Sequence, residues 1–193
     1  MPNGYLASNG WGQAIDVWNP ANGGLIRALT AHDDGVTSLA VLSNGYLASG
    51  SLREMKIWNI DTGSLIRTLA GHTGYVYSLA ALPNGHLASG SLDKTIEIWN
   101  TNTGSLIKTL TGHANSIDSL AVLPNGNLVS GSDDRTIKIW NADTGSLIRT
   151  LTGHTAEVRS LAVLPNGFLA SGSFDKTIKM WNADESAKYG LFK

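Results

Sequence analysis

Residues 82–113, LPNGHLASGSLDKTIEIWNTNTGSLIKTLTGH, contain nearly every feature that decides the fold of this chain. Copies of this segment recur along the sequence, and its first four residues return as MPNG at residue 1, LSNG at residue 42 and LPNG at residues 82, 123 and 164. The copies are spaced 40 or 41 residues apart. A constant period of about 40 residues indicates a repeat architecture, in which each unit packs against its neighbours. The 193 residues are therefore expected to form between four and five small units that share one continuous core.

Each period predicts four short strands separated by turns. Pro83-Asn84-Gly85 suits a hairpin, because proline sets one turn dihedral and Asn-Gly tolerates positive φ. No segment has helical periodicity, and both faces of the strands carry apolar residues, so every four-stranded antiparallel meander must be covered on both sides. Radial stacking covers both sides, and the sequence therefore predicts an all-β propeller of about five blades. Within residues 75–113 the four strands are expected at residues 75–81, 87–91, 95–99 and 106–110.

A Gly-His pair precedes a tryptophan in each of the last three periods, as in Gly71-His72 and Trp99. With these marks the chain resembles the WD40-repeat family, although the usual Trp-Asp pair reads Trp-Asn here. The resemblance extends over residues 1–184 and is followed by a tail, 185–193. It implies a WD40 β-propeller with the repeats 1–41, 42–81, 82–122, 123–163 and 164–184.

The resemblance also implies a buried hydrogen-bond network of His, Ser, Asp and Trp in each blade. Such a network rigidifies a blade when every donor and acceptor is paired. The second repeat lacks the aspartate, and the first retains only Ser8 and Trp18, so we expect these two blades to be looser. The three complete sets are His72, Ser89, Asp93 and Trp99; His113, Ser130, Asp134 and Trp140; and His154, Ser171, Asp175 and Trp181.

The Ser, His and Asp residues do not indicate an enzyme. The trio recurs in blade after blade, whereas catalysis needs one accessible nucleophile in one cleft. The chain has no cysteine, no Gly-rich phosphate loop and no histidines that would converge on a metal, so we expect no catalytic residue, metal or cofactor. The balance of 14 basic and 15 acidic residues favours neither a nucleic acid nor a membrane partner. Without a targeting signal, a cytoplasmic protein is expected.

Positions that differ between the near-identical copies are candidates for function. One variable set follows each Gly-His pair, and another precedes the turn aspartate; the strand order brings both to the end of the blades where partners bind in the resembled family. Exposed aromatic residues near an arginine are typical of binding hot spots, although neutral drift of turn residues after duplication is the alternative. The predicted partner-binding residues are Trp11, Tyr75, Tyr77, Leu92, Asp118, Asp133, Arg159 and Phe174.

The predicted first blade lacks its innermost strand, and the fifth lacks its outermost. The two ends therefore do not complete each other, and we expect an open or partial propeller with uncovered edges. Three explanations remain: the chain is a fragment of a longer propeller, it completes a ring as a homo-oligomer, or it closes alone. The function predicted is a non-catalytic scaffold that binds a protein or peptide partner, and the alternative is a self-assembly unit whose main partner is itself.

Overall fold

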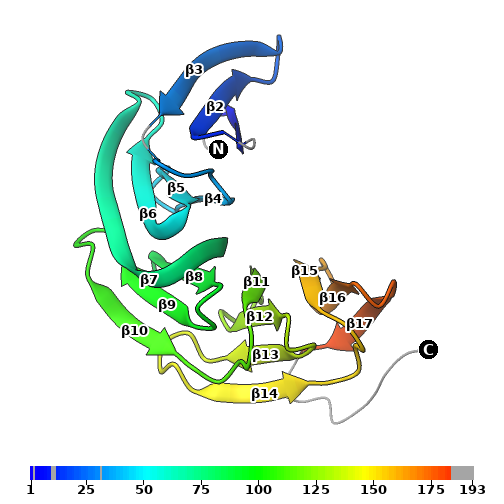
Figure 1. The fold of residues 1–193 in the computed structure, drawn as a ribbon. Helices are drawn as coiled ribbons and strands as arrows, with labels where there is room; N and C mark the ends of the chain where they lie inside the picture. The colour runs from blue at the N-terminus through cyan, green and yellow to red at the C-terminus, as the bar shows by residue number, and fades with distance from the viewer. Residues whose placement is uncertain (2, 10–11, 31, 184–193) are drawn as a thin grey trace.

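The computed structural model describes residues 1, 3–9, 12–30 and 32–183, which form seventeen strands and no helix. They follow an open arc in which sheets succeed one another around a central space, with the N-terminal sheet at one end and β15 to β17 at the other (Figure 1). The strands are β1 (Leu6–Asn9), β2 (Ala14–Asn19), β3 (Gly24–Thr30), β4 (Ser38–Val41), β5 (Leu47–Gly50), β6 (Leu52–Asn59), β7 (Ser64–Ala81), β8 (His86–Ser91), β9 (Ile96–Asn100), β10 (Leu106–Leu110), β11 (Ile117–Val122), β12 (Leu128–Ser132), β13 (Ile137–Trp140), β14 (Leu147–Leu151), β15 (Val158–Val163), β16 (Phe168–Ser173) and β17 (Ile178–Asn182).

Every strand pair is antiparallel, and each meander corresponds to one blade. Blade 1 contains β1 to β3, blade 4 contains β11 to β14, and blade 5 contains β15 to β17. Blade 2 contains β4 to β6 and the first half of β7. Blade 3 contains the second half of β7 and β8 to β10. The predicted all-β propeller is confirmed, and among the described residues its first and last blades have three strands each. The predicted tail 185–193 lies outside the described residues.

One strand, β7, runs without a break from blade 2 into blade 3. Its counterparts are interrupted at Gly112 and Gly153, whose φ angles of 143° and 148° bend the chain between blades. Gly71 at the same position is not among the residues with positive φ, so the strand continues there. The turn before β6 is one residue shorter than in the other blades, and Leu52 pairs directly with Tyr75 of β7. A local deletion thus accompanies the joining of two blades into one sheet of seven strands.

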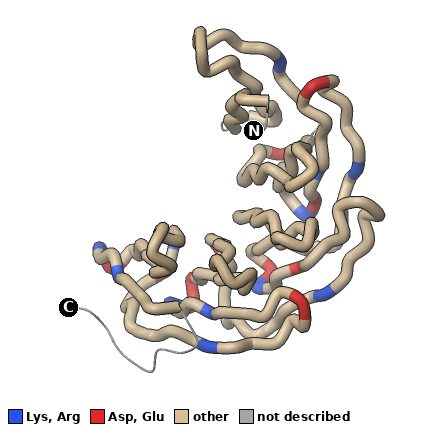
Figure 2. The backbone as a smooth tube through the Cα atoms, turned by 180° about the vertical axis from the view of Figure 1, so that it is seen from behind, with Lys and Arg blue, Asp and Glu red and all other residues tan. Residues whose placement is uncertain are grey.

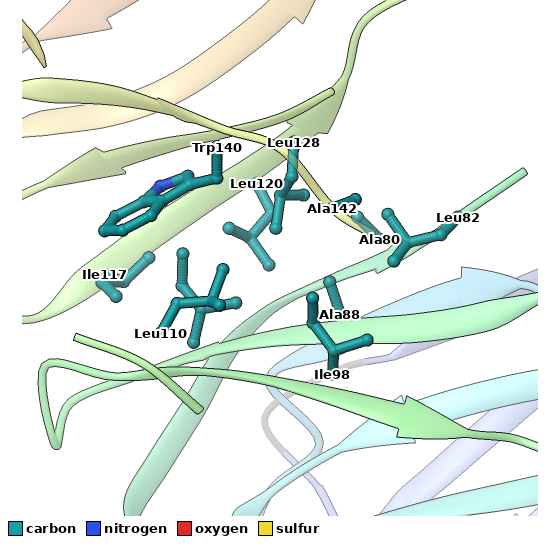
Figure 3. Close-up of a cluster of buried hydrophobic side chains, with 11 residues drawn as sticks. Ala80, Leu82, Ala88, Ile98, Leu110, Ile117, Leu120, Leu128, Trp140 and Ala142 are labelled. Carbon is teal, nitrogen blue, oxygen red and sulfur yellow. The ribbon is translucent and has the colours of Figure 1, made fainter. Parts of the chain in front are cut away.

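The hydrophobic core lies between blades rather than inside them. At the junction of blades 3 and 4, Ala88, Ile98 and Leu110 meet Leu128 and Trp140 (Figure 3). Three more clusters of the same kind lie at the other junctions. Burying one large aliphatic or aromatic side chain contributes about 1.5–3 kcal/mol, so each junction is a major source of stability. This explains why a repeat of this kind needs neighbours to fold.

Polar contacts also link consecutive blades. The hydroxyl of Ser78 accepts a hydrogen bond from the backbone N–H of Leu120 at 2.9 Å, and Ser119 accepts one from Leu161 at 3.1 Å. On the outer strand, the Arg67 guanidinium donates to two carbonyl oxygens of the next blade, at 2.7 and 3.0 Å. The arc is therefore held by one interface repeated from blade to blade. None of the described residues belongs to a helix that could span a membrane.

Candidate functional site

In blades 3 to 5, both sets of variable positions lie at the same end of the blade, which we name the channel-mouth face. It comprises the start of each innermost strand and the turn between the second and third strands. Backbone hydrogen bonds join the two segments within a blade: Leu92 N–H donates to the Tyr75 carbonyl at 2.9 Å, and Phe174 N–H donates to Glu157 at 3.0 Å. Side chains that are far apart in the sequence are thereby placed next to one another.

In blade 3, Tyr75 and Tyr77 stack against each other. Their ring centroids are 6.2 Å apart and their planes differ by 5°. Both residues are half-buried, so the expectation that they are exposed is wrong, because each ring covers part of the other. Leu92 of the neighbouring turn is 43% exposed. Trp11, which we also predicted for this face, lies outside the described residues.

Blades 4 and 5 are joined on this face by a group of side chains that we call the Arg159 clamp. The guanidinium of Arg159 in blade 5 lies 3.1 Å from Asp118 Oδ2 and 3.2 Å from Asp133 Oδ1, both in blade 4. It also lies over the ring of Phe174, with Cζ 4.7 Å from the centroid. Ser116 Oγ donates to Asp133 Oδ2 at 2.7 Å. The structure thus brings together four of the predicted partner-binding residues and adds Ser116.

The clamp places one positive charge beside two neighbouring carboxylates. Burial, and after it the neighbouring Asp133, raise the pKa of Asp118 to about 7, although the positive charge of Arg159 and the Ser116 hydroxyl act in the opposite direction. Elsewhere charged residues are scattered along the arc in both signs (Figure 2). Phe174 remains 63% exposed above the clamp. The charged groups therefore hold the two blades in place, while the phenyl ring is the part of the clamp most available to a partner.

The predicted His, Ser, Asp and Trp side chains meet in blades 3, 4 and 5. In blade 4, His113 Nδ1 lies 2.7 Å from Asp134 Oδ2, and His113 Nε2 lies 2.7 Å from Ser130 Oγ. Trp140 Nε1 donates to the same serine at 2.9 Å. Blades 3 and 5 repeat these contacts within 2.7–3.0 Å, through His72, Ser89, Asp93 and Trp99 and through His154, Ser171, Asp175 and Trp181.

A threonine completes each network and was missed in the sequence. Thr136 Oγ1 donates to Asp134 Oδ1 at 2.6 Å, and the backbone N–H of Ala114 donates to Asp134 Oδ2 at 2.9 Å. Burial alone would raise the pKa of Asp134, but the hydrogen bonds from His113, Thr136 and Ala114 outweigh it and hold the pKa well below its usual range. The signal was present as an Asp-x-Thr spacing in three repeats.

These networks are built for rigidity rather than for nucleophilic chemistry. Ser89 and Ser130 are fully buried, and each serine hydroxyl is occupied by an indole N–H and an imidazole. A substrate would have to displace both partners to reach the oxygen. Among the described residues, no group of three or more His, Cys, Asp or Glu side chains could hold a metal ion.

The first two blades depart from the pattern in different ways. In blade 2, Glu54 supplies the carboxylate that the sequence comparison counted as missing: its Oε1 lies 3.2 Å from His32 Nδ1 and 2.8 Å from Lys56 Nζ. In blade 1, the Trp18 indole donates to Ser8 at 2.8 Å in an exposed setting. The side chain of glutamate is longer than that of aspartate, so Glu54 reaches the histidine from the shorter turn. Comparing residue positions between the repeats did not reveal this contact.

Comparison with known proteins places these observations in context. A family model described as "WD domain, G-beta repeat" matches residues 23–59, 63–100, 104–141 and 145–182. Among solved structures, the chain is similar to the "Crystal structure of WD40 beta propeller domain of Doa1", with a TM-score of 0.85 and 30% sequence identity. The match covers 95% of this chain and 62% of that one, so this chain spans less than two thirds of the solved domain. A comparison with curated proteins gave no match.

Proposed function

Because this chain belongs to the WD40-repeat family, whose propellers generally serve as protein-interaction scaffolds, we propose that it is a non-catalytic scaffold that binds a peptide or protein partner on its channel-mouth face. The observation that supports this most directly is the pair of apolar side chains on the turns of this face. Phe174 is 63% exposed and Leu92 is 43% exposed, in turns whose sequence differs from blade to blade.

The surroundings of these two side chains suit a binding surface. The guanidinium of Arg159 packs against one face of the Phe174 ring, and a ring held in this way loses less conformational entropy when a partner covers it. The stacked pair of Tyr75 and Tyr77 adds aromatic surface with hydroxyl groups. Aromatic anchors next to an arginine are enriched among residues that dominate binding energy. A partner with apolar side chains spaced to meet blades 3 and 5 is the kind that fits.

Selection from a displayed peptide library against the chain would test the proposal, with affinities then measured for a selected peptide. Replacing Phe174 by alanine should weaken binding about tenfold or more, as expected for a central aromatic anchor. Leu92→Ala should weaken it less, by a few-fold. Ile107→Ala is the matched control, because Ile107 is a 40% exposed apolar residue on the outer strand of the same blade as Leu92.

Unchanged affinity in the two variants would contradict the proposal. If the peptide binds Phe174→Ala and Leu92→Ala as tightly as it binds the parent chain, the channel-mouth face is not its site. A loss in Ile107→Ala equal to that in Leu92→Ala would point to the rim of the propeller instead. Circular dichroism of each variant separates lost contacts from lost folding.

A further inference from the structure

The chain contains four copies of one interface between blades, and each copy uses the same positions. We name the side that packs onto the following blade the donor face, and the side that receives the preceding blade the acceptor face. The donor face is formed by small or β-branched residues of the second strand and by aliphatic residues of the third. The acceptor face is formed by a leucine of the second strand, the tryptophan of the third and, in blades 2 to 5, a buried valine or isoleucine at or just before the start of the innermost strand.

Among the residues that the structure describes, none covers the donor face of blade 5. Ile178 is 78% exposed, whereas the residues at its position in the four other blades are 0–1% exposed. Those four residues are Ile15, Met55, Ile96 and Ile137. Ala170 and Met180, which share this face, are only half-buried, although their counterparts in blades 2 to 4 are 0–1% exposed.

The acceptor face of blade 1 is uncovered at the other end of the arc. Leu6 is 57% exposed, and its counterparts in the later blades are 0–1% exposed. Trp18 is half-buried, against 2–8% exposure for the four later tryptophans. Pro20 beside it is exposed, and its counterparts are buried. Leu47, Leu87, Leu128 and Leu169 are the leucines compared here.

We propose that the donor face of blade 5 binds the acceptor face of blade 1 in a second copy of this chain. The occupant follows from the molecule itself, because the four internal junctions show which surface covers a donor face, and the second- and third-strand part of that surface is exposed on blade 1. The residues of both faces named above carry no charge, so their contact buries no ionic group. This contact is independent of the channel-mouth face.

Such a contact is heterologous, because two different surfaces meet. Head-to-tail contacts of this type either close into a ring or continue into a longer assembly. The arc is C-shaped, and its two ends face one opening (Figure 1). A second copy bound at one end must therefore leave the plane of the first arc, or both arcs must flatten. A dimer with only one such contact is the simplest species in which to test the pairing.

Two charge substitutions make that dimer accessible. Ile178→Glu blocks the donor face and Leu6→Glu blocks the acceptor face, and neither should disturb folding because both side chains are largely exposed in the single chain. By light scattering, the parent chain should exceed the monomer mass as concentration rises. Each variant alone should require at least ~10-fold higher concentration to associate, because a buried unpaired carboxylate disfavours the contact.

The decisive measurement mixes the two variants. Ile178→Glu carries an intact acceptor face and Leu6→Glu an intact donor face, so their mixture should form a one-to-one dimer at concentrations at which each variant alone is a monomer. Leu106→Glu is the control, since Leu106 is 44% exposed in the middle of the arc and should leave association unchanged. A parent chain that stays monomeric at all concentrations, or a mixture that does not pair, would overturn the proposal.

Discussion

Replacing Ser130 by alanine should be one of the most damaging single-atom deletions in this protein. Ser130 is fully buried, and its hydroxyl accepts from Trp140 Nε1 at 2.9 Å and lies 2.7 Å from His113 Nε2. With the His113 Nδ1–H donated to Asp134, the serine hydroxyl donates to Nε2, and one oxygen atom thus pairs two buried groups. Removing that oxygen leaves the indole N–H and the imidazole nitrogen without partners.

The magnitude follows from the two groups left unpaired. Each buried polar group without a hydrogen bond costs about 1–3 kcal/mol, so Ser130→Ala should lower the free energy of unfolding by about 2–6 kcal/mol. Ser8→Ala in blade 1 is the matched comparison, because Ser8 also accepts from a tryptophan, Trp18, at 2.8 Å. Ser8 is exposed and has no histidine partner, so water can replace the lost oxygen and the loss should stay below about 1 kcal/mol.

Equilibrium urea denaturation, followed by tryptophan fluorescence and by circular dichroism, measures both losses. Hydrogen exchange of the amides in β12 and β13 shows whether the destabilisation is centred on blade 4, as expected when each repeat contacts only its neighbours. Equal losses for Ser130→Ala and Ser8→Ala would refute this reasoning, and so would a loss below about 1 kcal/mol for Ser130→Ala.

Three further predictions concern charge and packing. Burial and the neighbouring acid raise the pKa of Asp118 to about 7, so this group contributes stability fully below its unfolded pKa of about 4 and loses that contribution as the pH rises through about 7. In Asp118→Asn the urea midpoint should therefore fall less between pH 5 and pH 8 than in the parent. A methyl group added at Gly131 would lie 2.9 Å from a valine side chain and 3.2 Å from a backbone oxygen, both in blade 5. Gly131→Ala should therefore lower the free energy of unfolding by about 1–3 kcal/mol, as measured by urea denaturation. Gly172→Ala is the control, because a methyl group there meets only a serine side chain, and it should cost less than about 1 kcal/mol. The buried Glu97 carboxylate has an oxygen without a hydrogen bond, and Lys138 stands at the same position in blade 4. Glu97→Lys should therefore raise the melting temperature at pH 8, and Lys138→Glu should lower it. Shifts in the opposite directions would contradict this account.

Much of the candidate site could be read from the repeat. The Gly-His pair, the serine, the turn aspartate and the tryptophan recur at constant spacing, and a spacing repeated in every blade yields the same local geometry each time. The residues brought together in blade 4, from His113 to Trp140, illustrate this. Glu54 shows the limit of such reasoning, because a longer side chain on a shorter turn reaches the same imidazole nitrogen.

The sequence by itself determined the strand order and the stacking of one blade on the next. A period of 40 or 41 residues repeats local hydrogen-bond and packing patterns, and each repeat contacts only its neighbours. Only the tertiary structure decided what the variable residues do. Arg159 meets Asp118 and Asp133 across a junction between blades, and Tyr75 stacks on Tyr77 through rotamers that no spacing encodes. It also showed that Ile178 and Leu6 stand uncovered at opposite ends of the arc, since exposure depends on whether a neighbouring blade is present rather than on the residue itself.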